Sequence, residues 1–193
     1  MRVQKKQKIR VKSGHTGNKK FSASWLVITV LLTFTLSVAI SAITSVQMKD
    51  MALGASLGVL LFIILVGILF DILGTAVTAA SEVPFHSMAS NRVRGARRTI
   101  RLIRHSEKVA NVCCDVIGDI CGIVSGAVGT LIVSDLVLYH GFNLIITSLV
   151  ATGVISSVTV GGKALGKTFA ITNCNAIVYA VGRAISIFEK KEK

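Results

Sequence analysis

The hydrophobic pattern of this chain is dominated by long stretches without charge. No charged side chain occurs in residues 21–48 or in residues 51–70. Each stretch supplies the roughly 20 apolar residues with which a helix crosses the hydrocarbon core of a bilayer. Two less uniform apolar stretches follow later in the chain. The pattern predicts an all-α membrane protein with four transmembrane helices, at about 24–47, 51–80, 111–134 and 142–161.

The first predicted span has a competing interpretation. Residues 1–39 could form a cleavable signal peptide, because Ser37, Val38 and Ala39 make an acceptable small-residue cleavage site. The uncharged run, however, is about twice as long as the apolar core of a normal signal peptide. The length of the run therefore favours an uncleaved membrane anchor.

Charge predicts the orientation of the spans. The 193 residues include 22 Lys and Arg but only 9 Asp and Glu, which gives a formal net charge of +13. The basic residues cluster at 2–20, at 92–108 and beyond 163. By the positive-inside rule these clusters lie in the cytoplasm. The chain is therefore predicted to be a multi-pass protein of the cell membrane with both termini cytoplasmic.

The segments outside the spans are expected to lie along the membrane surface. Residues 1–20 are a basic N-terminal segment, the link after the second span predicts a basic cytoplasmic helical hairpin, and 166–193 predict an amphipathic juxtamembrane helix with a basic tail. The four spans form one domain over 21–165. No aromatic residues for base stacking are interleaved with the basic clusters, so anionic lipid is the expected partner and nucleic acid is not.

Acidic residues inside the predicted spans indicate function. A carboxylate at membrane depth costs at least a few kcal/mol unless it faces a bundle interior, pairs, or meets water or a cation. Small and polar residues share a helical face with such an acid in the second span (Asp71, Gly74, Thr75, Thr78, Glu82) and in the third (Asn111, Asp115, Gly118, Asp119, Gly122, Gly126, Gly129). The glycines of the third span are spaced for a close approach of another helix.

Asp71 and Asp119 are expected at one depth. Each lies eight to ten residues from the predicted cytoplasmic end of its span, or roughly 12 to 15 Å at the helical rise. Antiparallel neighbours would bring these carboxylates together, and a divalent cation accepts such oxygen ligands. Without a cation, repulsion would force one of the pair to protonate. Alternatively, Asp71 is a protonated structural residue hydrogen-bonded to Thr75 or Thr78, and Asp115 is an acid at a helix end.

Several short segments carry a resemblance to a known family. They are residues 70–78 (FDILGTAVT), 94–96 (RGA), 102 (L), 107–108 (EK) and 117–119 (IGD). Over about residues 55–165 the chain resembles the membrane domain of the CorB/CorC/cyclin-M family of magnesium transporters, in which oxygens from two helices hold a magnesium ion in a homodimer.

The resemblance implies binding and transport of Mg²⁺ by a homodimer. By position, the family's serine falls on Asp71, its glutamate on Gly74 and its asparagine on Asp119. Because the family's acid is missing at Gly74, charge has moved to Asp71 and Asp119. The paired regulatory domains that usually follow in the family have no room before Lys193. A separate regulatory protein is therefore a possible further partner.

The predicted metal ligands are Asp71 and Asp119, with Thr75 and backbone oxygen near Gly118 as further ligands and Asp115 as an inner relay. The alternative is a non-transporting membrane module that binds or regulates a partner protein. An enzyme is not expected, because no combination of nucleophile, base and orienting group is present.

One motif is misleading. Residues 161–168 (GGKALGKT) match the phosphate-loop pattern, but the membrane spans around them leave no place for a parallel sheet. The glycines are expected to end the fourth span, and the lysines to mark its cytoplasmic side.

Overall fold

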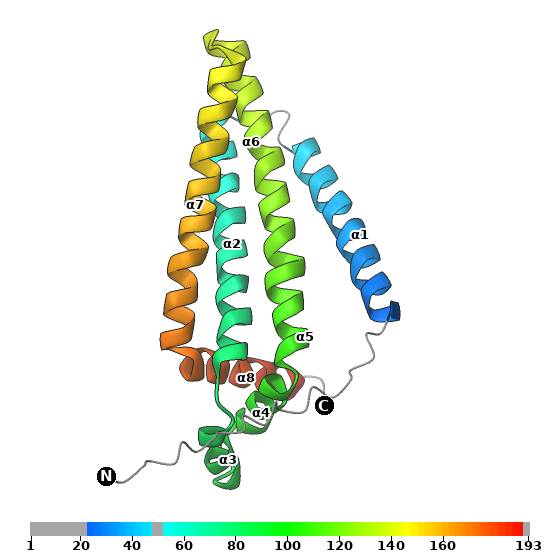
Figure 1. Cartoon of the computed structure of the whole chain (residues 1–193), viewed down its shortest axis with the longest axis vertical. Helices are drawn as coiled ribbons and strands as arrows, with labels where there is room; N and C mark the ends of the chain where they lie inside the picture. The colour runs from blue at the N-terminus through cyan, green and yellow to red at the C-terminus, as the bar shows by residue number, and fades with distance from the viewer. Residues whose placement is uncertain (1–22, 48–51, 191–193) are drawn as a thin grey trace, which may run out of the picture.

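The structure, a computed structural model, describes residues 23–47 and 52–190, and each regular element in these two ranges is a helix. The longest helices are α1 (Ala23–Gln47), α2 (Leu53–Ala79), α6 (Gly118–His140) and α7 (Leu144–Thr172). They run along the length of the molecule (Figure 1). Four helical stretches are long and apolar enough to cross a membrane, as predicted for a membrane protein. The predicted basic segment 1–20 lies outside the described residues.

The third and fourth spans are longer than predicted. The third runs without a break from Ser106 to Tyr139, and α6 ends before Gly141, whose φ is 63°. In α7 the side chain of Asn143 caps the first turn, and the helix continues to Thr172. The expectation that glycines 161 and 162 end the fourth span is therefore wrong. A glycine inside a helix costs only about 1 kcal/mol, which packing readily offsets.

That packing is between α7 and α2. A Cβ atom added to Gly162 would overlap Ile68, and one added to Gly166 would lie 2.9 Å from the side chain of Ile72. The glycines therefore let α2 approach α7 closely. As a consequence, Lys163 and Lys167 belong to the long apolar helix α7 and not to a separate tail.

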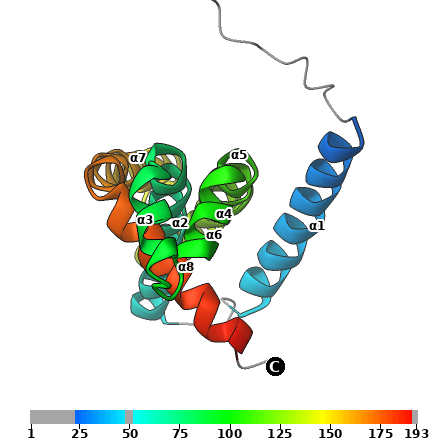
Figure 2. The ribbon, with the colours of Figure 1, turned by 90° about the horizontal axis from the view of Figure 1, so that it is seen from below.

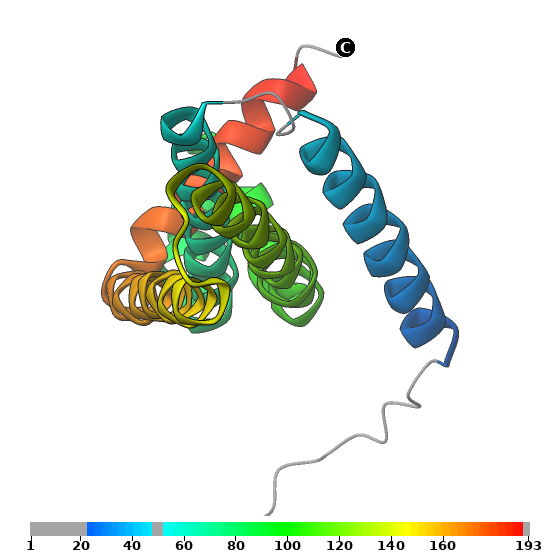
Figure 3. The same ribbon diagram turned by 90° about the horizontal axis from the view of Figure 1, so that it is seen from above.

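The core between α2 and α6 is aliphatic. Its buried residues recur at every fourth position along the third span and meet two residues of α2 (Val116, Ile120, Val124, Val128, Ile132; Leu60, Ile64). The glycine face of the third span is turned toward α7 and not toward α2: a Cβ added to Gly129 would overlap the side chain of Ile155, whereas nothing lies within 4 Å of a Cβ added to Gly122 or Gly126. Both line a cavity of about 490 Å³ between α6 and α7. Seen from above, α2, α6 and α7 cluster, whereas α1 lies at the edge of this cluster, in contact with α6, with most of its apolar side chains exposed (Figure 3).

Short helices gather at one end of the bundle. They are α3 (Val83–Ser90), α4 (Ala96–Arg104) and α5 (Ser106–Ala110), and α8 (Cys174–Lys190) lies across the same end (Figure 2). A second core joins α2, α3, α4, α7 and α8 (Ala76, Val77, Phe85, Ile103, Ala170, Val178). The rings of Phe85 and Tyr179 stack with their centroids 6.5 Å apart. This end is thus fixed to the bundle by burial as well as by chain connection.

The contact between α4 and α8 depends on Gly95. Its φ is 88°, and an added Cβ would lie 2.9 Å from the Cα atom of Arg183. Left-handed backbone costs a side chain roughly 1–2 kcal/mol, and overpacking typically adds 1–3 kcal/mol. We expect Gly95→Ala to lower the free energy of unfolding by at least about 2 kcal/mol, measured by unfolding in detergent. Gly58→Ala is the matched control, because the space around Gly58 is open and alanine favours helix. Equal stability of the two variants would contradict this prediction.

Candidate functional site

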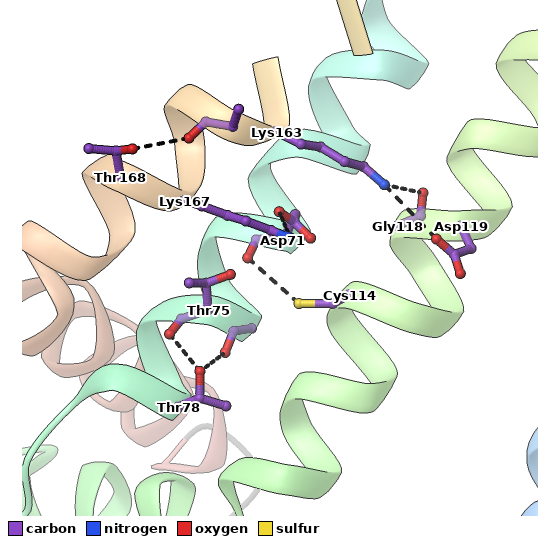
Figure 4. Close-up of polar contacts among 11 residues, drawn as sticks. Asp71, Thr75, Thr78, Cys114, Gly118, Asp119, Lys163, Lys167 and Thr168 are labelled. Carbon is purple, nitrogen blue, oxygen red and sulfur yellow. Dashed lines mark hydrogen bonds and ion pairs between the residues drawn. The ribbon is translucent and has the colours of Figure 1, made fainter. Parts of the chain in front are cut away.

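Asp71 is a buried acid in the middle of the bundle. The residue is 3% exposed, and its Oδ2 atom accepts no hydrogen bond from the described residues. The Nζ atom of Lys167 lies 3.8 Å from Oδ2, which is an ion pair too long to be a hydrogen bond (Figure 4). The Lys167 side chain is 54% exposed. Among the described residues, the ion pair to Asp71 is therefore one long, half-exposed contact.

Asp119 forms a second acid–lysine pair. Its Oδ1 atom lies 4.0 Å from Nζ of Lys163, and the same ammonium group donates a hydrogen bond to the Gly118 carbonyl at 3.4 Å. The Asp119 side chain is 68% exposed, whereas that of Lys163 is 23% exposed. Lys163 and Lys167 are one turn apart on α7. One face of α7 therefore supplies a counter-charge to an acid of α2 and to an acid of α6 (Figure 4).

The other predicted ligands lie in different environments. The Thr75 carbonyl accepts a hydrogen bond from the Thr78 hydroxyl at 2.8 Å. That hydroxyl also donates to the Gly74 carbonyl, at 3.4 Å, so it bonds to backbone and not to Asp71. Asp115 is exposed. Among the described residues no group of three His, Cys, Asp or Glu side chains is placed to hold a metal ion.

Gly74 lies at a close contact between α2 and the third span. A Cβ atom there would overlap the Cys114 sulfur and lie 3.2 Å from Cβ of Cys113. The Cys114 thiol also donates a weak hydrogen bond to the Asp71 carbonyl, at 3.7 Å. A side chain at position 74 would therefore require the side chains of Cys113 and Cys114 to shift.

The third span contains a π-helix, η2 (Asn111–Ile117), that the sequence did not predict. It includes Asp115 and ends directly before Gly118 and Asp119. Such π-helical turns are rare in proteins, and those that occur are often found at functional sites. It packs against α2 beside Gly74, where the two cysteines fill the contact.

The lysines of α7 are the site residues that sequence reasoning missed. Lys163 and Lys167 are spaced by four, as one face of a helix requires. That spacing could have signalled them if the fourth span had been extended beyond residue 161. They were instead counted as cytoplasmic charge.

The fold and the site are those of a helical protein with four helices long and apolar enough to cross a membrane and with acid–lysine pairs between the long helices. Comparisons with protein-family models, with curated proteins and with solved structures found no match for this chain.

Proposed function

We propose that this protein binds a divalent cation, Mg²⁺, at Asp71 and Asp119 and transports it across the membrane. The observation that carries the proposal is the Oδ2 atom of Asp71, which is buried and accepts no hydrogen bond from the described residues. A buried carboxylate oxygen without a donor is costly to keep charged. It is also the kind of ligand that a hard cation prefers. The resemblance of residues 55–165 to magnesium transporters agrees with this choice of ion.

A Mg²⁺ ion needs only a few ligands from the protein. Mg²⁺ gives up its waters reluctantly and is usually bound by one or two carboxylates with several waters retained. Asp71 and Asp119 would be those carboxylates, with the carbonyl of Gly118 and oxygen of Thr75 completing the shell. Asp115 is exposed on η2, at the end of the third span nearer α4 and α8, and would be an inner relay for the ion.

The lysines of α7 supply the positive charge when no ion is bound. Lysine carries its ammonium group on a flexible four-carbon stem, so the group can withdraw while the backbone stays in place. Lys167 is half-exposed and has space to withdraw. Exchange of a lysine charge for an ion would keep Asp71 from being left alone as a buried anion.

The basic clusters favour a cytoplasmic position for both termini and for the short helices α3 and α4, of which α4 is rich in arginine. Anionic lipid would then contact these helices and α8. A homodimer is proposed from the family resemblance, and a separate regulatory protein would bind at the cytoplasmic end.

A second candidate function, a non-transporting membrane module, is favoured by the acid–lysine pairs themselves. Each pair offsets an acid without any ion. Such a module would keep the fold and interact with a partner protein. The two candidates differ in whether an ion ever replaces a lysine charge.

Uptake of Mg²⁺ into proteoliposomes distinguishes these functions. We expect wild-type protein to admit Mg²⁺, detected by an enclosed indicator dye, and Asp119→Asn to reduce the initial rate at least about tenfold, because one charged ligand is lost. Asp135→Asn is the matched control, since this acid lies near the opposite end of α6 from Asp119. A wild-type rate equal to that of empty vesicles would leave the non-transporting module as the better account.

A further inference from the structure

The turn between α3 and α4 is rich in arginine and forms a cavity of its own. The cavity has a volume of about 490 Å³ and is lined by residues of one short segment (Ala89, Arg92, Val93, Arg94, Gly95, Arg97, Arg98). This volume is within the usual range of small-molecule sites. Its lining includes four arginines and neither Asp nor Glu, and three of these arginines (Arg92, Arg94, Arg97) are exposed. An anion bound among like charges relieves their mutual repulsion.

The backbone of this arginine turn is fixed by contacts that involve no ligand. Arg92 has a positive φ of 56°, which is uncommon for a residue with a side chain. The Tyr179 hydroxyl of α8 donates a hydrogen bond to the Arg94 carbonyl, at 3.4 Å. Gly95 packs so closely on Arg183 that a Cβ atom would not fit. A site held in shape before its ligand arrives loses little conformational freedom on binding.

The acid Glu82, which precedes α3, makes its ion pairs away from this turn. Glu82 lies 3.3 Å from Nε of Arg104 and 3.3 Å from Nε2 of His86, and none of these residues lines the cavity. Arg92, Arg94 and Arg97 are exposed, so a ligand from solvent or from the membrane surface can reach them.

We propose that the arginine turn binds a phosphate group, carried by an anionic lipid headgroup or by a soluble phosphate ester. The planar guanidinium fork matches the oxygens of phosphate and forms paired, charge-assisted hydrogen bonds with them. Both sources are present on the side of the membrane to which the positive-inside rule assigns this turn. The proposal is independent of the cation site, which lies within the long helices.

The test uses the full-length protein in neutral detergent with a chelator, so that the cation site stays empty. Pyrophosphate and a short-chain phosphatidylglycerol are the probes, and their affinities are measured by the shift in thermal unfolding at constant ionic strength. We expect at least one probe to stabilise the wild type and Arg97→Gln to weaken its binding about tenfold. Arg101→Gln is the matched control. It removes the same charge one turn further along α4, outside the cavity, and should keep wild-type affinity.

Each outcome has one meaning. Stabilisation by phosphatidylglycerol alone identifies a lipid headgroup as the ligand, and stabilisation by pyrophosphate identifies a soluble phosphate. Arg94→Gln, also in the cavity lining, should weaken binding like Arg97→Gln and replaces it if that variant does not fold. The proposal is overturned if neither probe stabilises the wild type. Equal weakening by the cavity variants and by Arg101→Gln would also overturn it, because the attraction would then be to diffuse positive charge.

Discussion

Asp71→Asn should abolish stabilisation by Mg²⁺ and leave the ion-free protein at least as stable as the wild type. A neutral amide is cheaper to bury at membrane depth than a carboxylate, and Lys167, already 54% exposed, can turn its ammonium group toward water. The same change removes the charge that would hold the ion. We expect the affinity for Mg²⁺ to fall roughly a hundredfold, since interactions with a charged group contribute about 1.5–3 kcal/mol each.

The measurement is unfolding of purified protein across a range of Mg²⁺ concentrations. An ion present at 100 times its dissociation constant raises the free energy of unfolding by about 2.7 kcal/mol when it binds only the native state. Wild type and Asp135→Asn should show this shift, and Asp71→Asn should not. An absence of any shift in the wild type, or a full shift in Asp71→Asn, would end the hypothesis of an ion at Asp71.

The spans could be predicted from the sequence because their apolar runs are long enough for a helix to cross the hydrocarbon core of a bilayer. The bounds of α7 could not, since residues 161–163 (GGK) have the composition that normally ends a span. Whether a glycine ends a helix or admits a neighbour depends on what lies opposite, and here Ile68 and Ile72 of α2 lie opposite. Packing against α2 therefore allows α7 to continue past these glycines, although the local sequence favours an end there.

The third span carries two helical stripes, one of glycine and one of aliphatic residues. Both have the spacing of a helix face, so periodicity could not say which one meets α2. The structure places the aliphatic stripe there, because branched side chains make more van der Waals contacts with Leu60 and Ile64 than glycine can. Gly122 and Gly126 are left lining the cavity beside α7.

The sequence pattern indicates the acids but not their lysine partners, for a physical reason. A carboxylate inside an apolar run is conspicuous, whereas a lysine near the end of a run looks like an ordinary cytoplasmic anchor. A long lysine stem lets the charge reach several ångströms from its own helix. The pairs with Lys163 and Lys167 therefore depend on how α7 is rotated about its axis relative to α2 and α6. The residue pattern of one helix does not give that rotation.

Lys167→Gln gives the strongest contrast between the two candidate functions. Without its partner, Asp71 becomes a buried carboxylate with no counter-charge from the described residues. We expect the free energy of unfolding without Mg²⁺ to fall by about 1–3 kcal/mol, below the loss for a fully buried pair because Lys167 is half-exposed. If a cation binds Asp71, removal of the competing ammonium group should raise the affinity for Mg²⁺ about tenfold or more, so that saturating Mg²⁺ restores stability.

Two comparisons make this result specific. Lys163→Gln should cost little stability, because its partner Asp119 has a side chain that is 68% exposed and can be solvated without it. The double variant Asp71→Asn with Lys167→Gln should recover the stability lost by Lys167→Gln alone and remain insensitive to Mg²⁺, since both charges of the pair are gone. A non-transporting module predicts the same loss for Lys167→Gln and the same recovery in the double variant, but no rescue by Mg²⁺ in either. Rescue of the single variant by Mg²⁺ therefore decides whether Lys167 stands in for an ion or only neutralises an acid.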